Sequence, residues 1–171
     1  MKTIKTQIPD RSLTNNYLPA DYTDSFTCTI DATKEILPDD IMVGFWTNSP
    51  GWVTALFKLR NFLVKFVGLK GDNENDLEKL ESCIRSGGSH GIASVPAKND
   101  NETVLLLTDK HLEAYMSVFI EKKENLQEIS TITLVHFKNK LGPIYFFFIK
   151  PFHNIVVRSM LKRSIKHQIE K

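Results

Sequence analysis

The spacing of hydrophobic residues changes along the chain, and each change predicts a different element. Residues 1–17 are polar with weak periodicity, and we predict an extended arm there. Phe26, Cys28 and Ile30 alternate with threonines, which is the period-two pattern of a half-buried strand. A helical turn is predicted next, from Ile41 to Trp46.

Two longer helices are then predicted. In the first, Ser49 is the expected N-cap, Pro50 the first helical residue, and Gly68 the left-handed residue beyond the end. A wide apolar stripe at three- and four-residue spacing predicts that this helix packs against a sheet; it is made of Trp52, Leu56, Leu59, Leu63 and Phe66. The second helix is acidic and is expected to start at Asn75 and to end at Gly87-Gly88.

From Gly91 onward the pattern is that of strands separated by turns. Gly91–Pro96 and Thr103–Thr108 flank a polar turn, which predicts a hairpin. The alternation from Leu112 to Ile120 is the most regular in the chain, and Ile129–Phe137 forms another strand. These strands follow one another closely, so we expect antiparallel pairing.

The last part of the chain begins with its most apolar run. Ile144–Ile149 is apolar on both faces and is predicted to be a strand that Pro151 ends. Asn154 then caps a basic amphipathic helix over residues 155–169. Its apolar stripe is expected to be buried in the domain.

Together these elements predict an α+β fold in one domain spanning residues 1–171, a length usual for a single domain. We expect a curved antiparallel sheet wrapped around the long C-terminal helix, with two shorter helices after the first strand. This is the START-like, helix-grip arrangement. In such a fold the space between sheet and helix can be a pocket rather than a filled core.

Composition excludes several classes of function. A net charge of +2 is too small to indicate a nucleic-acid partner. The two cysteines are too few and too far apart for a disulfide scaffold or a zinc knuckle, and we predict no metal and no cofactor. The most apolar stretch, residues 142–157, is interrupted by Lys150 and His153, so no transmembrane segment is predicted. Without a signal-peptide pattern, a cytoplasmic location is expected.

Several segments resemble a known family. They are Leu18–Phe26, Trp52–Arg60, Asp109–Leu112, Leu141–Tyr145 and Lys150–His153. With them the chain resembles the Domain of Unknown Function 2867 family, which is found alone or behind a short-chain dehydrogenase domain. The resemblance implies a START-like fold, no established activity, and a functional link to such a dehydrogenase. Pro143 departs from the family pattern, in which arginine often follows the glycine.

The candidate ligand-binding residues are Arg60, His111, Tyr145, Phe148 and His153. Arg60 could hold a carboxylate or phosphate in a bidentate contact, or form a surface ion pair. The two histidines could titrate in a cleft, or simply occupy a strand end and a corner. The aromatic pair could line a cavity or belong to the core.

Three hypotheses follow. The first is a module that binds a small hydrophobic or amphipathic molecule, oriented by Arg60, His111 or His153. The second is an enzyme of the cyclase, dehydratase or hydrolase kind, in which a cavity histidine beside a carboxylate or tyrosine acts as general base. The third is a protein or membrane-surface module that uses the basic terminal helix, and burial of Val156, Met160 and Leu161 would remove it.

Overall fold

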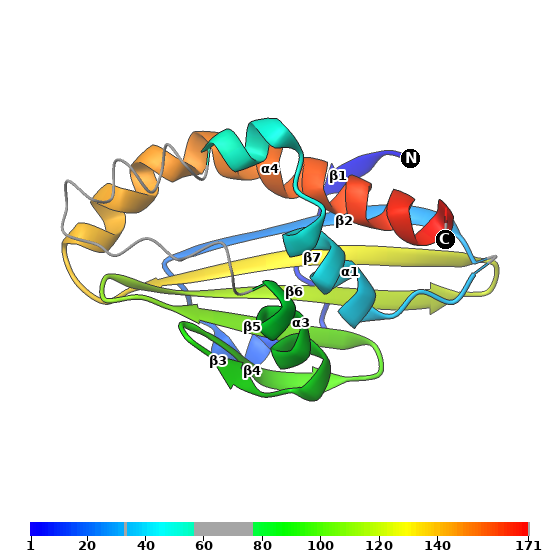
Figure 1. Cartoon of the computed structure of the whole chain (residues 1–171), viewed down its shortest axis with the longest axis horizontal. Coiled ribbons are helices and arrows are strands. Elements are labelled where there is room, and N and C mark those ends of the chain that lie inside the picture. The colour runs from blue at the N-terminus through cyan, green and yellow to red at the C-terminus, as the bar shows by residue number, and fades with distance from the viewer. Residues whose placement is uncertain (33, 57–76, 171) are drawn as a thin grey trace.

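The computed structural model describes residues 1–32, 34–56 and 77–170 (Figure 1). Its sheet has seven antiparallel strands in the order β1-β2-β7-β6-β5-β4-β3. The strands are β1 Thr3–Lys5, β2 Tyr22–Asp31, β3 Ser89–His90, β4 Ala93–Asn99, β5 Glu102–Thr108, β6 Leu112–Lys123 and β7 Leu126–Phe137. The helices with complete descriptions are the 3-10 helix η1 Leu13–Tyr17, α1 Pro38–Thr47, α3 Leu77–Ser86 and α4 Leu141–Glu170.

The predicted fold class is confirmed. The curved antiparallel sheet, the long α4 and the shorter helices form an α+β, helix-grip-like arrangement, and α4 runs along the length of the sheet in Figure 1. The predicted hairpin and the two strands after it are confirmed as β4–β5, β6 and β7. The predicted turn at Ile41–Trp46 is confirmed within α1, and the acidic helix is confirmed as α3. Gly87 follows α3 with φ of 74°, which suits glycine.

The predicted strand at Ile144–Ile149 is wrong, because this run lies inside α4. Asn139 Oδ1 accepts a hydrogen bond from Leu141 N at 3.0 Å, which begins the helix, and Pro143 falls in the first turn, where no N–H is needed. A short run that is apolar on both sides does not distinguish strand from helix. Pro151 also fails to end the element: α4 continues through it, and its exposed position lets water bind the carbonyl that loses its N–H partner.

The predicted helix after Ser49 begins one residue later than expected. Thr54 N donates to Pro50 O at 3.1 Å, so Pro50 occupies the N-cap position, and residues 51–56 are helical. The remainder of this prediction, including Arg60 and Gly68, lies outside the described residues.

The main core lies between the sheet and the helices. The inward side of α4 contributes buried side chains to one cluster with β2, β6, β7 and α1; they are Val157, Met160, Leu161 and Ile165. Val156 of the same stripe is partly buried against this cluster. The hypothesis that this stripe binds a membrane surface or a partner protein is therefore wrong; the opposite side of α4 is exposed. The burial of the stripe also means that apolar side chains fill the space between the sheet and the C-terminal half of α4.

The N-terminal arm packs on the opposite face of the sheet instead of extending freely. β1 pairs with β2, and Thr3 is fully buried. Ile8 and Tyr17 pack against a second apolar cluster on this face, formed by Phe119, Ile132 and Leu134. The sheet is therefore covered on both faces.

Candidate functional site

A buried carboxylate lies where β2 meets α4. Asp24 occupies β2, and its side chain has no exposed surface. His153 of α4 places Nε2 at 3.0 Å from Asp24 Oδ2, and Tyr22 donates its hydroxyl proton to the same oxygen at 2.6 Å. Tyr22 and Asp24 share one face of the strand because side chains two residues apart point the same way. A phenol, a carboxylate and an imidazole are thus in direct contact.

Aromatic rings enclose this cluster. Tyr22 packs on Phe146 with ring centroids 4.6 Å apart, and Phe146 in turn packs on Phe137 at 5.9 Å. The rings of His153 and Tyr22 are nearly perpendicular, with centroids 5.9 Å apart. Lys150 Nζ lies 5.6 Å from the Tyr22 ring centre, within cation–π range. The polar cluster therefore has apolar walls and one nearby cation.

The hydrogen bonding of Asp24 is incomplete. Its Oδ1 atom is buried and has no hydrogen-bond partner among the described residues. His153 Nε2 reaches Oδ2 in distance, yet its direction does not fit a hydrogen bond, so the contact is an approach of two ionisable groups rather than a well-aligned bond. Leaving a buried acceptor unpaired costs about 1–3 kcal/mol. The cluster therefore keeps hydrogen-bonding capacity that the described fold does not use.

The Tyr22 hydroxyl stays protonated to a higher pH than an ordinary tyrosine, because its pKa is raised. Burial raises the pKa of Tyr22, and the adjacent Asp24 raises it further, through their hydrogen bond and through the repulsion between two negative charges. Asn154 Oδ1 lies 3.4 Å from the same hydroxyl, a weaker contact than the one to Asp24. Around neutral pH the phenol is therefore a donor.

The comparisons with known proteins give a family and no activity. A family model described as a protein of unknown function (DUF2867) matches residues 17–160. The chain belongs to the DUF2867 family. No curated protein and no solved structure matched this DUF2867 chain. The matched region contains the whole cluster around Asp24 and His153.

In this DUF2867 chain three of the segments that carry the family resemblance, Leu18–Phe26, Asp109–Leu112 and Leu141–Tyr145, are held together near the cluster. Asp21 Oδ2 accepts from Phe137 N at 2.7 Å, which joins the start of β2 to the end of β7. Asn139 donates to Lys110 O at 3.1 Å, which joins the start of α4 to the start of β6. A Cβ atom on Gly142 would lie 2.6 Å from His111 O, so only glycine allows this approach. These residues have structural roles that leave Asp24 and His153 still to be explained.

The predicted site residues of the DUF2867 chain are placed unequally. His153 lies beside a carboxylate and a tyrosine, which meets one of the two conditions of the enzyme hypothesis, the other being a cavity; its side chain is 16% exposed. His111 contacts Asn139, with Nδ1 2.9 Å from the amide nitrogen, at the start of α4. Tyr145 is half-buried, whereas Phe148 is exposed on the outer side of α4. Arg60 lies outside the described residues.

The sequence patterns above do not single out Asp24 as a site residue. The available signal was the strand alternation itself: extended backward from Cys28 and Phe26, it places Asp24 on the buried face. A charged residue that the alternation places on the buried face of a strand is unusual, and this makes it a candidate site residue rather than a surface turn residue.

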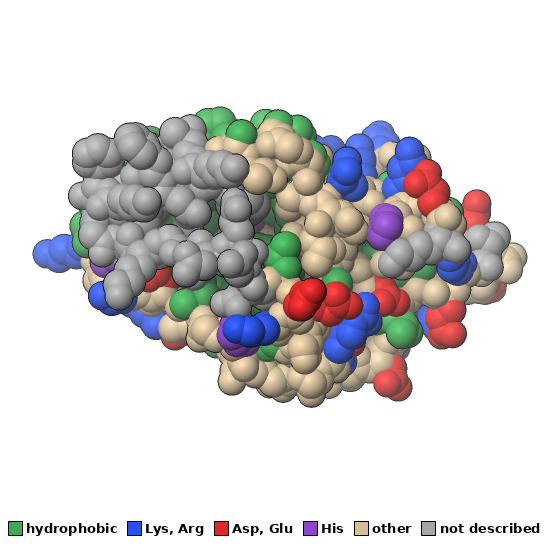
Figure 2. All heavy atoms as spheres, viewed as in Figure 1, with side chains coloured by type: hydrophobic (Ala, Val, Ile, Leu, Met, Phe, Trp, Pro, Cys, Tyr) green, Lys and Arg blue, Asp and Glu red, His purple; other side chains and the backbone are tan. Residues whose placement is uncertain are grey.

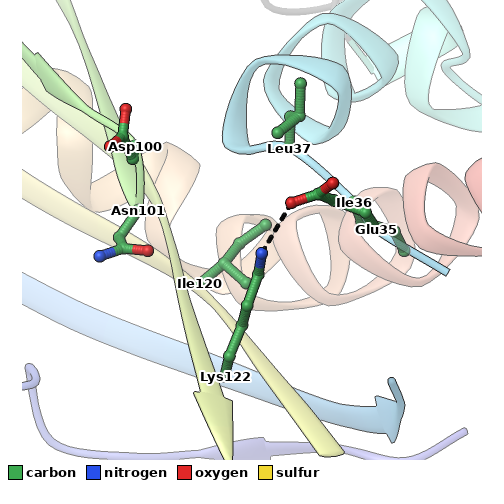
Figure 3. Close-up of a pocket in the computed structure, with 7 residues that line it drawn as sticks. All are labelled: Glu35, Ile36, Leu37, Asp100, Asn101, Ile120 and Lys122. Carbon is green, nitrogen blue, oxygen red and sulfur yellow. Dashed lines mark hydrogen bonds and ion pairs between the residues drawn. The ribbon is translucent and has the colours of Figure 1, made fainter. Parts of the chain in front are cut away.

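An open pocket of about 390 Å³ lies at the other end of the strands (Figure 3). It is lined by Glu35, Ile36, Leu37, Asp100, Asn101, Ile120 and Lys122. The ion pair of Lys122 with Glu35, 2.8 Å long, lies at its mouth, and both side chains are largely exposed. None of the predicted site residues lines this pocket. Within the described part of the chain, no group of three or more metal-binding side chains occurs.

Proposed function

We propose that this DUF2867 protein binds a small hydrophobic or amphipathic molecule where β2 meets α4, in a START-like manner. The observation that carries the proposal is the buried Asp24, with its unpartnered Oδ1, beside Tyr22 and the partly exposed His153. Stability alone is a poor explanation, since replacing a buried ionic cluster with apolar side chains is often neutral or favourable. A ligand that supplies the missing hydrogen bond accounts for its presence.

The surroundings define the ligand class. His153 is the partly exposed member of the pair and Asp24 has no exposed surface, so we expect a ligand to enter past His153. A polar group with a donor hydrogen, such as a hydroxyl, would satisfy Asp24 Oδ1, and the rings of Tyr22 and Phe146 offer a flat apolar wall beside it. We therefore expect a small alcohol-bearing or otherwise amphipathic molecule rather than a purely apolar one.

Native mass spectrometry of the purified full chain, before and after organic extraction, tests this proposal. We expect a co-purifying mass that Asp24→Asn and His153→Gln each reduce at least about tenfold, the effect of one lost charge-assisted hydrogen bond. His136→Gln is the matched control, since His136 is also half-buried beside a tyrosine but lies on β7, facing Tyr115. A chain with no bound mass and no thermal shift across a panel of amphipathic alcohols would contradict the proposal.

A second candidate, an enzyme of the cyclase, dehydratase or hydrolase kind, is favoured by the contact between His153 and Asp24. Asp24 would orient the imidazole and His153 would act as general base, as in other carboxylate–histidine pairs. Turnover of a panel of esters and hydroxy compounds, lost together in Asp24→Asn and His153→Gln, would support it. Binding without turnover leaves the first candidate.

The link to a short-chain dehydrogenase is also a proposal, and it rests on the family resemblance. A dehydrogenase would produce or consume a hydroxyl group, which matches the donor that Asp24 Oδ1 lacks. Identification of the co-purifying molecule as an alcohol or its ketone would support this link, and a ligand with neither group would contradict it.

A further inference from the structure

The outward side of α4 is apolar along its N-terminal half. Ile144, Phe148, Phe152 and Ile155 follow one another at four-, four- and three-residue spacing, so they share one face, and Phe147 lies beside them. All are exposed, with Phe147 at 72% and Phe148 at 64%. Contiguous exposed aromatic and aliphatic side chains of this kind mark an interaction surface.

The same side of α4 becomes basic along its C-terminal half. The next outward positions are Arg158, Lys162, Arg163 and Lys166, and α4 contains no acidic residue before Glu170. Arg158 also donates to Thr3 O at 2.8 Å, which ties β1 to this end of the helix. In Figure 2, lysine and arginine side chains gather where the C-terminal half of α4 and β1 lie. The face thus combines an apolar half with a cationic half.

We propose that this outward face of α4 docks on the surface of an anionic lipid bilayer. The phenylalanines would enter the boundary between headgroups and acyl chains, and the bases would lie along the lipid phosphates. Apolar rings beside four bases, of which Lys166 alone has an acidic partner on α4, Glu170 at 3.5 Å, complement such a surface. Two copies of α4 paired antiparallel over their full length would instead place apolar halves against basic ones. Among the described helices, none is long and apolar enough to cross a membrane.

Flotation of the full chain with phosphatidylcholine vesicles, with or without phosphatidylserine, tests the docking. Wild-type protein should float with the anionic vesicles and be released by salt. Ile144→Asp combined with Phe147→Asp should weaken binding by about tenfold or more, because two apolar side chains that would enter the bilayer are replaced by charged ones. Arg163→Glu combined with Lys166→Glu should weaken it by about tenfold or more on anionic vesicles only.

Leu126→Asp is the matched control, because Leu126 is also an exposed apolar residue, at 42%, but lies at the β6–β7 turn. It should float as wild type does. Two results would overturn the proposal: failure of wild-type protein to float with anionic vesicles, or flotation unaffected by Ile144→Asp with Phe147→Asp. A concentration-dependent dimer or a soluble acidic partner that this double variant releases, with no lipid binding, would assign the face to protein instead. Neither altered position contacts the Asp24 cluster, so this test and the ligand test fail independently.

Discussion

The sheet carries two buried carboxylates on opposite faces, and they differ in how fully they are bonded. Glu102 of β5 faces the N-terminal arm and is completely buried. Its Oε1 accepts from Ser12 Oγ at 2.7 Å and from Ser117 Oγ, and its Oε2 accepts from Leu13 N at 2.6 Å. Asp24 of β2 faces α4, with one oxygen crowded by two partners and the other without any.

The comparison separates a structural carboxylate from a candidate functional one. Glu102 receives three donors from the arm and β6, so its charge fastens the arm to the sheet. Asp24 meets a histidine in poor hydrogen-bond alignment inside aromatic walls, an arrangement that stabilises little. Both carboxylates are buried, but only Glu102 has hydrogen-bond donors at both of its oxygens. The second carboxylate is the one with capacity left for another molecule.

Glu102→Ala gives the largest expected loss of stability. Removal of the carboxylate leaves two buried hydroxyl donors and one partly buried N–H without this acceptor, and we expect the free energy of unfolding to fall by about 3 kcal/mol. Urea denaturation measures it, and hydrogen exchange should show the arm opening first. Glu35→Ala is the control: Glu35 pairs with Lys122 at the surface, where both side chains are largely exposed, and its loss should leave the urea midpoint close to that of wild type. If Glu102→Ala and Glu35→Ala reduced the free energy of unfolding equally, Glu102 would not be the structural carboxylate described above.

Gly142→Ala is expected to have the next largest effect. The added Cβ would lie 2.6 Å from His111 O and 3.0 Å from Phe137 Cδ1, and a backbone oxygen cannot give way cheaply. We expect a loss of about 2 kcal/mol from this overpacking. Gly51→Ala is the control, because nothing lies within 4 Å of its added Cβ. Since the start of α4 would shift, ligand binding at His153 should fall while the arm around Glu102 stays protected from exchange.

The fold was predictable from sequence wherever the apolar period was clear. β4 to β7 and α3 were found because alternation or three- and four-residue spacing was unbroken and flanked by turn residues. The run at Ile144–Ile149 was misassigned because its faces are both apolar, for different reasons. Phe146 is buried in the aromatic wall, whereas Phe147 and Phe148 form the exposed outward face of α4. The hydrophobic pattern of a sequence shows which side chains are apolar, but it does not show which of them are buried.

The candidate site was only half predictable. His153 was found because it stands at a family-like corner, but its partner lies 129 positions earlier in the chain, and only the packing of α4 on β2 joins them. Glu102 was missed entirely: its donors Ser12 and Leu13 lie in an arm whose sequence shows no apolar period. Contacts between distant segments are set by tertiary packing, which single-sequence patterns do not contain.

Asp24→Asn sharpens the comparison by removing charge without removing shape. The amide oxygen can still accept the hydrogen bond from the Tyr22 hydroxyl, so that donor keeps its acceptor. We therefore expect the free energy of unfolding to stay within about 1 kcal/mol of wild type. Binding of the co-purifying molecule should nevertheless be lost. Denaturation and native mass spectrometry on the same preparation measure both quantities. A loss of stability as large as that of Glu102→Ala would make Asp24 a structural residue after all.

Tyr22→Phe gives the smallest expected effect, confined to alkaline pH. The pKa of Tyr22 is raised in the folded chain by burial and by Asp24, while in the unfolded chain it is about 10. Above that pH the unfolded chain loses a proton that the folded chain keeps, so stability falls as pH rises. Tyr22→Phe should flatten this decline by less than about 1 kcal/mol, because the ring is partly exposed and screened by water.

Burial also raises the pKa of Tyr115, so Tyr115→Phe should flatten the decline in stability as well. Only the contribution of Tyr22 depends on Asp24: in Asp24→Asn, absorbance titration should show one tyrosine ionising earlier, and the same shift in a variant lacking Tyr22 would disprove this coupling.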